Sequence, residues 1–422
     1  MPQSPVWPGT LSLPGKLGTA MATNQMTLLV TVTGRDRPGV TSRLFSVLAA
    51  HELSVLDVEQ VVIRGRLVLG VLLSCGVAPD LTAIHRQVTA VAADLGLEAE
   101  ITAGSAEPTL RRGSLHVTVL GSMLPPAAIA AIAGRIAANG ANIDRISRLA
   151  HRPVTCIEFD VSGADPATLR TALASESVEQ GVDVAVQRGG LHRRAMRLVV
   201  MDVDSTLVSG EAIDLLAARA GSAAKVAEIT AATMRGELDF AAALRERVAL
   251  LAGLDAAVID EVRAELRLAP GARTLIRTLR RLGYKCGIVS GGFTQFTDEL
   301  AADLGLDYAE ANTLEIKEGK LTGQVTGSIV DRAGKATALR DFAAQAGVPL
   351  SQTVAVGDGA NDLDMIAAAG LGIAFNAKPA VRDAADASVS VPHLDAILHL
   401  LGISRDDVEA ADAEDQAQAP PT

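Results

Sequence analysis

Two aspartates separated by one residue, Asp202 and Asp204, could together carry out phosphoryl-transfer chemistry. They follow the apolar run Leu198–Met201, and Ser205 and Thr206 come directly after them. One carboxylate can attack phosphorus as a nucleophile while its neighbour transfers a proton. Clustered carboxylates also favour a hard, oxygen-seeking cation such as Mg²⁺. Alone, however, this pattern fits a strand end capped by solvated aspartates equally well, so the other motifs must decide.

Two motifs further along the chain could bind the oxygens of a phosphoryl group. Ser290 and Gly291 follow the short apolar run Cys286–Val289, so a hydroxyl and exposed backbone N–H groups are expected at a strand end. Lys335, directly before the helical pattern 336–346, would add a positive charge. Taken singly, a glycine turn and a solvated lysine explain these motifs just as well.

A second acidic loop follows another short apolar run. Val354–Val356 leads into Gly-Asp-Gly-Ala-Asn-Asp, which contains Asp358, Asn361 and Asp362. Short apolar runs that end in polar loops are typical of buried parallel strands, whose carboxyl ends meet at one edge of an open sheet. The sequence therefore predicts an α/β domain, a Rossmann-like parallel sheet with helices on both faces, and a site at its carboxyl edge.

In this order and spacing, the four motifs resemble those of the haloacid dehalogenase superfamily, over a region from Arg197 to about Gly402. The start Asp-x-Asp-Ser-Thr is similar to the phosphoserine phosphatase branch of that superfamily. The resemblance implies a Mg²⁺-dependent enzyme that hydrolyses O-phospho-L-serine to serine and phosphate, the last step of serine biosynthesis. Two alternatives remain: a phosphatase of another small phosphate or of phosphoproteins, and a serine sensor whose phosphatase half is vestigial.

The same resemblance assigns roles at the matching positions. Asp202 would be the nucleophile that becomes the aspartyl phosphate, and Asp204 the acid that later acts as base. Mg²⁺ would bind the carboxylates of Asp202 and Asp358 and the backbone carbonyl of Asp204, while Asp362 steadies its water shell. The residues expected to bind the substrate at this edge are Ser290, Gly291, Lys335 and Asn361.

About eighty residues separate the first two motifs, which is far more than a crossover helix needs. Helical periodicity occurs in Ile213–Ala220, Ala223–Met234 and Phe240–Leu251. We therefore expect a small helical cap, at about 210–268, that closes over the site and excludes water.

Two charged residues of this cap could read the substrate head group. By resemblance, Glu211 would take the ammonium and Arg247 the carboxylate, with Met234 and Phe240 as an apolar wall. Alternatively, Glu211 is only a first-turn acid that the helix dipole stabilises, and Arg247 is a surface residue paired with a nearby acid.

The first half of the chain contains an internal repeat with an offset of 87 residues. The segment Leu28–Gly34 recurs as Leu115–Gly121, and Pro38 recurs as Pro125. Each copy reads as strand, helix, strand, strand, helix, strand, the ferredoxin-like βαββαβ unit. In the first copy the expected elements are Thr27–Thr33, Val40–His51, Ser54–Ile63, Leu67–Ser74, Leu81–Leu95 and Glu98–Thr102.

The loop between the first strand and helix resembles that of ACT domains, which sense amino acids. Gly39 at the helix start would expose N–H groups that can take a carboxylate. The resemblance implies that ligands bind where two such domains pack side by side, and hence a homodimer, and serine is the expected effector because it is the expected product. Pro126 stands at the Gly39 position in the second copy, which argues against identical binding there. The alternative is that both copies only mediate dimerisation.

Composition limits the other partners. The net charge of −11 argues against nucleic acid and anionic membranes. The longest apolar stretch, Leu67–Ala78, is too short to span a bilayer. Three scattered cysteines, Cys75, Cys156 and Cys286, indicate a reducing cytoplasm.

These observations predict a series of domains along the chain. The linker is expected to be solvated because it is basic, and the tail to be disordered because six acids face one arginine there. The predicted segments, in chain order, are a disordered leader (1–25), ACT domain 1 (26–105), ACT domain 2 (113–187), a linker (188–195), the phosphatase domain (196–403) and a disordered acidic tail (404–422).

Overall fold

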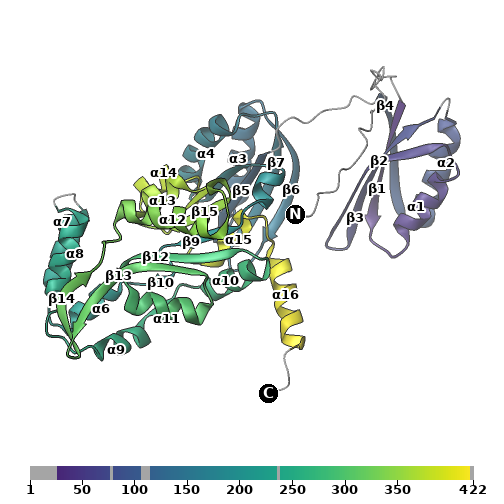
Figure 1. The fold of residues 1–422 in the computed structure, drawn as a ribbon. Coiled ribbons are helices and arrows are strands. Elements are labelled where there is room, and N and C mark those ends of the chain that lie inside the picture. Colours follow the sequence, from purple (N-terminus) through teal and green to yellow (C-terminus); the bar gives the residue numbers. More distant parts are fainter. Residues whose placement is uncertain (1–25, 77–78, 106–114, 235–237, 419–422) are drawn as a thin grey trace, which may run out of the picture. The chain divides into compact units, whose positions relative to one another are not determined.

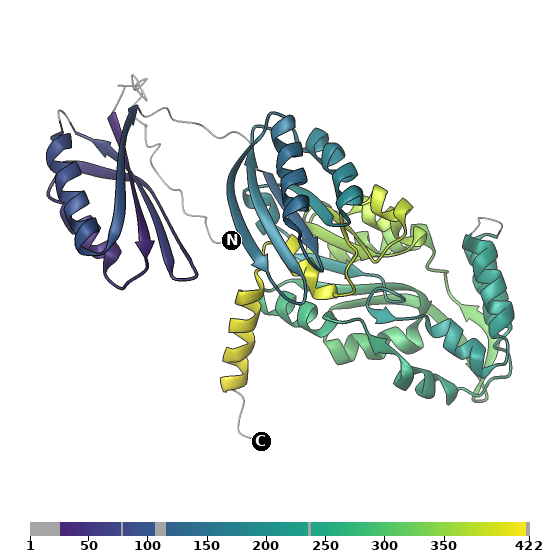
Figure 2. The same ribbon diagram turned by 180° about the vertical axis from the view of Figure 1, so that it is seen from behind.

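The computed structural model describes residues 26–76, 79–105, 115–234 and 238–418. The chain forms two compact units, Met1–Leu110 and Arg111–Thr422. The first unit contains the first repeat, and the second contains the second repeat and all that follows it (Figure 1, Figure 2). The predicted leader, residues 1–25, lies outside the described residues.

The first unit is a four-stranded antiparallel sheet with two helices on one face (Figure 1). The strand order is β2-β3-β1-β4. Leu28, Val30 and Val32 alternate along β1 and are buried in the core with the helices, as the period of two in a strand requires. The elements are β1 (Met26–Arg35), α1 (Val40–Leu48), β2 (Leu53–Ile63), β3 (Arg66–Cys75), α2 (Leu81–Asp94) and β4 (Leu97–Ser105). The predicted βαββαβ unit is confirmed.

The second repeat has the same topology, with the strand order β6-β7-β5-β8. Its elements are β5 (Leu115–Gly121), α3 (Pro126–Ala138), β6 (Asn142–Ala150), β7 (Thr155–Ser162), α4 (Pro166–Gln180) and β8 (Asp183–Arg188). Pro126 opens α3, where its missing N–H costs nothing. Gly39 instead caps α1 with a φ of 92°, a backbone conformation that glycine adopts readily. The two copies thus share a fold but begin their first helices differently.

A seven-stranded sheet forms the core of the remaining chain, with β9 at its centre. Its order is β14-β13-β12-β9-β15-β16-β17, and all neighbours pair in parallel except β13 and β14. The strands are β9 (Leu198–Met201), β12 (Lys285–Phe293), β13 (Tyr308–Lys317), β14 (Lys320–Thr326), β15 (Thr353–Gly357), β16 (Leu371–Phe375) and β17 (Ala387–Val389). This is the predicted Rossmann-like architecture.

Helices cover both faces of this sheet, which explains the unbroken apolar run of β9. Val199 and Met201 pack in one core cluster with α10, whereas Leu198 and Val200 pack in another with α12. The helices of this part are α5 (Leu191–Arg194), α10 (Ala272–Arg281), α11 (Thr294–Leu304), α12 (Arg332–Ala346), α13 (Leu363–Ala368), α14 (Pro379–Ala384), α15 (Ile397–Leu400) and α16 (Arg405–Gln418), with 3-10 turns η1 (Leu350–Gln352), η2 (Ala360–Asp362) and η3 (Leu394–Ala396).

A helical cap is inserted between β9 and β12. Two short antiparallel strands, β10 and β11, connect it to the core, and Val208 pairs with Leu268 between them. The cap elements are β10 (Val208–Ser209), α6 (Ala212–Arg219), α7 (Ala223–Met234), α8 (Phe240–Ala249), α9 (Val258–Glu265) and β11 (Arg267–Leu268). The three predicted helices are present, and α9 is an additional one.

The second repeat packs directly against the edge of the large sheet. Its strand β8 lies beside β17, and the buried Asp183 accepts hydrogen bonds from the Ser390 N–H at 2.6 Å and the Ser388 hydroxyl at 3.1 Å. Burial raises the pKa of Asp183. A carboxylate satisfied by donors from the other domain fixes how these two domains dock.

The prediction of a solvated linker is wrong for Arg193. This residue is only 7% exposed, pairs with Glu158 of the second repeat, and donates to the carbonyl oxygens of His399 at 2.8 Å and Leu400 at 3.0 Å. Carbonyl oxygens at the C-terminal end of a helix carry partial negative charge and attract a guanidinium. Arg193 therefore connects the second repeat to the phosphatase domain and is not solvated.

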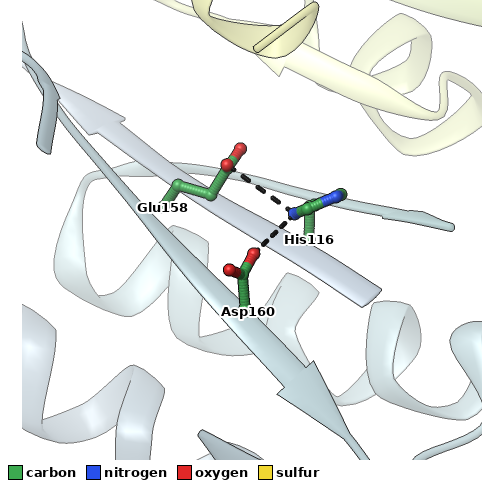
Figure 3. Close-up of side chains that lie close together, drawn as sticks. All are labelled: His116, Glu158 and Asp160. Atoms are coloured by element: carbon green, nitrogen blue, oxygen red, sulfur yellow. Dashed lines mark hydrogen bonds and ion pairs between the residues drawn. The ribbon is translucent and has the colours of Figure 1, made fainter. Parts of the chain in front are cut away.

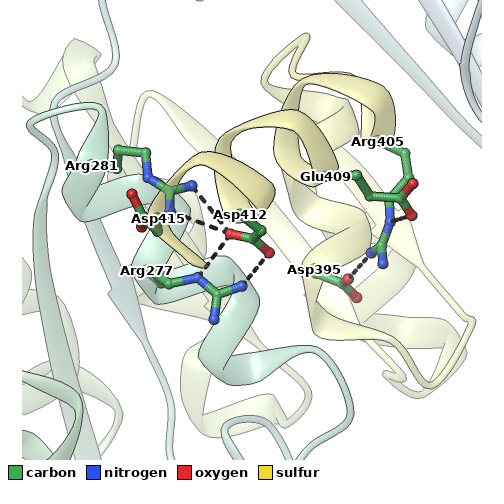
Figure 4. Close-up of polar contacts among 7 residues, drawn as sticks. All are labelled: Arg277, Arg281, Asp395, Arg405, Glu409, Asp412 and Asp415. Atoms are coloured by element: carbon green, nitrogen blue, oxygen red, sulfur yellow. Dashed lines mark hydrogen bonds and ion pairs between the residues drawn. The ribbon is translucent and has the colours of Figure 1, made fainter. Parts of the chain in front are cut away.

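The prediction of a disordered tail is also wrong, because 405–418 forms the helix α16. Val408 is buried in the main core cluster. Asp412 of α16 accepts a hydrogen bond from Arg277 Nε at 3.1 Å and lies 3.3 Å from Arg281 Nη1, both on α10 (Figure 4). Arg405 pairs with Asp395 at 3.0 Å. Arginines distant in sequence thus offset the local negative charge.

Candidate active site

The acidic pair lies at the carboxyl end of the central strand, as predicted. Asp202 directly follows β9 and is 4% exposed. Its N–H donates to the Val356 carbonyl of β15 at 2.9 Å, and its Oδ1 accepts from the Val203 N–H at 2.7 Å. The side chain is therefore held in one orientation at the centre of the sheet edge.

A buried lysine joins the two acidic loops. Lys335 Nζ lies 2.7 Å from Asp202 Oδ1 and 2.7 Å from Asp362 Oδ1, and all three side chains are buried. Burial lowers the pKa of Lys335, but the two carboxylates outweigh it and raise that pKa overall. Burial raises the pKa of Asp202, and the charge of Asp362 raises it further. The ammonium is therefore charged at neutral pH beside the predicted nucleophile.

Asp204 links the core loop to the cap. Its Oδ1 accepts from the N–H of Ala212, the first residue of α6, at 3.1 Å. Its Oδ2 accepts from the Ser290 hydroxyl at 2.9 Å. The second carboxylate of the pair therefore lies beside the predicted phosphate-binding serine, as a proton-transfer group would need to.

Glycines after Ser290 leave room for close contacts. A Cβ on Gly291 would lie 2.9 Å from the ring of Phe240 in the cap, and one on Gly292 would lie 2.8 Å from Asp204 Oδ2. The Gly292 N–H donates to Ser290 Oγ at 2.7 Å. Any side chain at these two positions would push the cap and the catalytic loop away.

Thr206 is a site residue that the sequence interpretation did not assign. It is fully buried, and its hydroxyl donates to Asp358 Oδ1 at 2.9 Å. The two residues are 152 positions apart, so only the fold reveals the contact. The Asp-Ser-Thr order was the available signal, because a hydroxyl placed two residues after Asp204 can reach the second acidic loop.

Three carboxylates of the site could hold a metal ion. Oxygen atoms of Asp202, Asp358 and Asp362 lie within 4.8 Å of one another. Burial, and then the charge of Asp362, raises the pKa of Asp358 to about 6. With Asp204, four carboxylates gather at this edge, where Lys335 pairs with two of them. A site of oxygen donors with excess negative charge fits a hard divalent cation such as Mg²⁺.

The predicted head-group residues lie in the cap. Arg247 on α8 is 8% exposed; its Nε makes no hydrogen bond within the described residues, and its Nη1 reaches Thr230 Oγ1 only at 3.4 Å. Glu211 is the N-cap residue of α6, but its carboxylate accepts no hydrogen bond from the first N–H groups of that helix. Burial, and then the charge of Asp204, raises the pKa of Glu211. Burial lowers the pKa of Arg247.

Asp214, one turn after Glu211, is a further charge near this arginine. Burial raises its pKa, and Arg247 opposes that shift. The sequence interpretation did not single it out. Of the two predicted wall residues, Phe240 contacts the site at Gly291, whereas the side chain of Met234 lies outside the described residues.

Two predicted positions remain, one in the acidic loop and one in the first unit. Asn361 is half-buried in η2, directly before Asp362 in the acidic loop after β15. Gly39 belongs to the first unit, at the start of α1, whose first turn has no side-chain cap.

A second cluster of possible ligands lies on the sheet of the second repeat (Figure 3). His116 Nδ1 is 2.7 Å from Asp160 Oδ1 and 3.6 Å from Glu158 Oε1. Glu158 also pairs with Arg193, so its charge is already offset. We interpret this cluster as part of the contact between the repeat and the phosphatase domain.

Comparison with known proteins identifies the domains. Residues 199–367 match the family of haloacid dehalogenase-like hydrolases, and residues 26–102 and 114–187 each match ACT domains. The chain is 62% identical to a phosphoserine phosphatase of Streptomyces coelicolor, over 93% of this chain and 97% of the relative. The chain belongs to the phosphoserine phosphatase family. The predicted resemblance and the enzyme class are thereby confirmed.

Other members of the phosphoserine phosphatase family agree with this assignment. A phosphoserine phosphatase of Mycobacterium tuberculosis is 56% identical, over 93% of this chain and 97% of the relative. The crystal structure of a probable phosphoserine phosphatase from Vibrio cholerae superposes with a TM-score of 0.54 at 36% identity, covering 71% of this chain and 90% of that one. Family members therefore share both sequence and fold with this chain.

Proposed function

We propose that the protein hydrolyses O-phospho-L-serine to L-serine and phosphate, as the last step of serine biosynthesis. The observation that carries this proposal is Arg247, a buried guanidinium in the cap whose Nε lacks a partner within the described residues. A buried cation without full pairing is costly unless a ligand completes it. The carboxylate of phosphoserine would do so, with Glu211 taking its ammonium.

In the first step, Asp202 attacks the phosphorus and becomes the aspartyl phosphate. Lys335 and Ser290 bind the phosphoryl oxygens, and Asp204 donates its proton to the departing serine oxygen, which becomes the hydroxyl of serine. The bond from phosphorus to the serine oxygen breaks as the bond to Asp202 forms. The hydrogen bond of 2.9 Å between Asp204 and Ser290 supports this placement of the acid beside the phosphoryl group.

In the second step, the deprotonated Asp204 accepts a proton from a water molecule that attacks the aspartyl phosphate. The products are phosphate and the free carboxylate of Asp202, so Asp204 regains its proton and the cycle closes. The cap contributes by excluding other water. The bond between Asp204 and the first N–H of α6 ties the general acid to the cap itself.

Asp202, Asp358 and the backbone carbonyl of Asp204 would hold Mg²⁺, with Asp362 steadying its water ligands. When bound, the ion supplies positive charge that offsets repulsion between the phosphate and the carboxylates. Thr206 and Lys335 orient Asp358 and Asp362 through hydrogen bonds of 2.9 Å and 2.7 Å. These two contacts support a preorganised oxygen site.

Removing divalent metal with EDTA is expected to reduce phosphoserine hydrolysis to below about one hundredth, because metal neutralisation of transition-state charge contributes several kcal/mol. Added Mg²⁺ should restore the rate and raise the thermal midpoint, since an ion that binds only the folded state stabilises it. Calorimetry of Asp358→Asn is the control, and this variant should lose the Mg²⁺-induced shift. A full rate in EDTA would contradict the metal assignment.

The substrate itself is tested by measuring phosphate release from phosphoserine, phosphothreonine and p-nitrophenyl phosphate in parallel. A preference for phosphoserine by at least about tenfold in kcat/KM is expected from head-group contacts. Equal rates on all three would favour a general phosphatase.

We place this activity in the cytoplasm, and the three free, buried cysteines fit that placement. Among the described helices, none combines the length and hydropathy needed to cross a bilayer.

We further propose that serine binds near the first ACT domain and inhibits the enzyme, in a homodimer formed through the ACT domains. The first N–H groups of α1 follow Gly39 and have no side-chain cap, which supports binding of a carboxylate there. A ligand at this position can regulate only by favouring one arrangement of the domains over another.

Gly39→Ala is expected to relieve the serine inhibition that exceeds product competition, while the uninhibited rate stays nearly unchanged. A Cβ at Gly39 meets only Ser42 Oγ, at 3.9 Å, so its main effect is strain at a φ of 92°. Gly65→Ala is the matched control, because Gly65 also has a positive φ, 75°, and open surroundings. The measurement is inhibition by serine at several substrate concentrations.

A chain that begins at Arg111, the start of the second unit, should also lose this inhibition. If inhibition is purely competitive and identical in the wild type, Gly39→Ala and the shortened chain, the ACT domains serve only as a dimerisation platform.

A further inference from the structure

A cavity of about 350 Å³ adjoins the loop after β9 that carries Asp204. It lies between helix α11 on one side and, on the other, the strands β10 and β11, which connect the cap to the core. Most of its lining is apolar. Its main hydrophobic residues are Val208, Leu266, Leu268, Phe293, Phe296 and Leu300. An apolar cavity of this size, located between two domains, has the dimensions of a site for a small molecule.

The cavity adjoins the predicted substrate site but is lined mostly by residues outside it. It touches Asp204 and Ser290 at its inner end, but Lys335, Glu211 and Arg247 are not among its lining residues. The carboxylate of Asp204 is already satisfied by the Ala212 N–H and the Ser290 hydroxyl. An occupant would therefore pack behind these two residues without replacing the substrate.

A hydroxyl in the cavity wall lacks a partner among the described residues. Thr297 is 1% exposed, and its Oγ1 makes no hydrogen bond within the part of the chain that the structure describes. A threonine inside a helix usually bonds a carbonyl of the preceding turn, and a buried hydroxyl without a partner is costly. A ligand with one hydrogen-bonding group would satisfy it.

The charges at the outer rim of the cavity already form pairs. Arg273 Nη2 lies 2.6 Å from Asp303 Oδ2, and Arg263 pairs with Glu299. Neither arginine is therefore free to select an anion. The chemistry of the wall favours a neutral, mostly apolar molecule with a single hydroxyl or similar group.

The position of the cavity connects it to cap movement. Val208 and Leu268, which face each other in the two connecting strands, both line it. The Ala269 N–H donates to the Leu207 carbonyl at 2.9 Å and continues this connection. A molecule packed against both strands would favour one position of the cap.

We propose that this cavity binds a small neutral amphipathic molecule, such as a phenol, and that its occupancy slows turnover by restraining the cap. The class of ligand follows from the apolar wall, the unpartnered hydroxyl of Thr297 and the paired rim charges. Binding is independent of the proposed function, whereas the effect on turnover rests on it.

The binding test is a ¹⁹F NMR titration of the full-length protein with 4-fluorophenol. Saturable binding with a dissociation constant of about 1 mM or lower is expected for a fragment of this size. Leu300→Trp should abolish it by filling the cavity, while Leu282→Trp, at an exposed position directly after α10 and outside the cavity, should not. Thr297→Val should weaken binding about fivefold through loss of one hydrogen bond. No saturable binding, or equal binding by Leu300→Trp, overturns the proposal.

The kinetic test measures phosphoserine hydrolysis with and without 4-fluorophenol. A lower kcat with an unchanged KM in the wild type, and no effect in a Leu300→Trp protein that still turns over, supports control through the cap. Competitive inhibition would place the probe in the substrate site and refute a separate site. If phosphoserine is not a substrate, both the proposed function and the proposed control of its turnover fail. The ¹⁹F titration would still show whether the cavity binds the probe.

Discussion

Asp202→Asn is expected to lower kcat for phosphoserine by more than about a thousandfold, because an amide cannot form the acyl phosphate. The surroundings of Asp202 leave little room for another carboxylate to replace it as the nucleophile. Asp202 is 4% exposed and is held by Lys335 Nζ and the Val203 N–H, each at 2.7 Å. The measurement is phosphate release at saturating substrate, with rapid quench to detect any covalent phosphoenzyme.

The same variant is expected to fold, because Lys335 keeps its ion pair with Asp362 at 2.7 Å. Thermal unfolding followed by circular dichroism checks this. Asp204→Asn is the informative companion, since it should slow both chemical steps and leave phosphate binding largely intact. If Asp202→Asn keeps more than about a thousandth of the wild-type rate, another group is the nucleophile.

The fold could be predicted where local pattern and tertiary environment agree. β9 and β15 lie buried between helices on both faces, so their sequences are continuous apolar runs that identify them directly. The helix α16 could not be predicted, because its acidic residues are neutralised by arginines of α10 that lie 135 positions away at Arg277. Counting the charges of a local sequence segment cannot include arginines that lie so far along the chain.

The candidate site shows the same division between local and distant information. The motifs predicted which residues gather at the sheet edge, since parallel strands must end there together. They did not reveal that Thr206 bonds Asp358 or that Asp214 lies near Arg247. Arg193 was misjudged for the same reason, because its partners Glu158 and Leu400 come from two other domains.

Arg247→Ala should lower kcat/KM for phosphoserine by roughly 30-fold to several thousand-fold, as the loss of a charged partner for a bound ion costs about 2 to 5 kcal/mol. Hydrolysis of p-nitrophenyl phosphate should change little, because this substrate has neither a carboxylate nor an ammonium. Arg247→Lys should lie between these extremes, since it keeps the charge but loses the planar fork. Glu211→Gln should likewise impair phosphoserine selectively.

Arg245→Ala is the matched control, because Arg245 is exposed on the same helix α8 and should affect neither substrate. The comparison separates recognition from stability. Arg247 offsets the charges of Glu211 and Asp214 in the cap, so its removal could loosen α6 and α8, but a loosened cap would slow both substrates alike. A selective loss on phosphoserine therefore identifies a contact with the amino-acid head group. An equal loss on both substrates would mean that Arg247 holds the cap together, and the specificity would have to come from elsewhere.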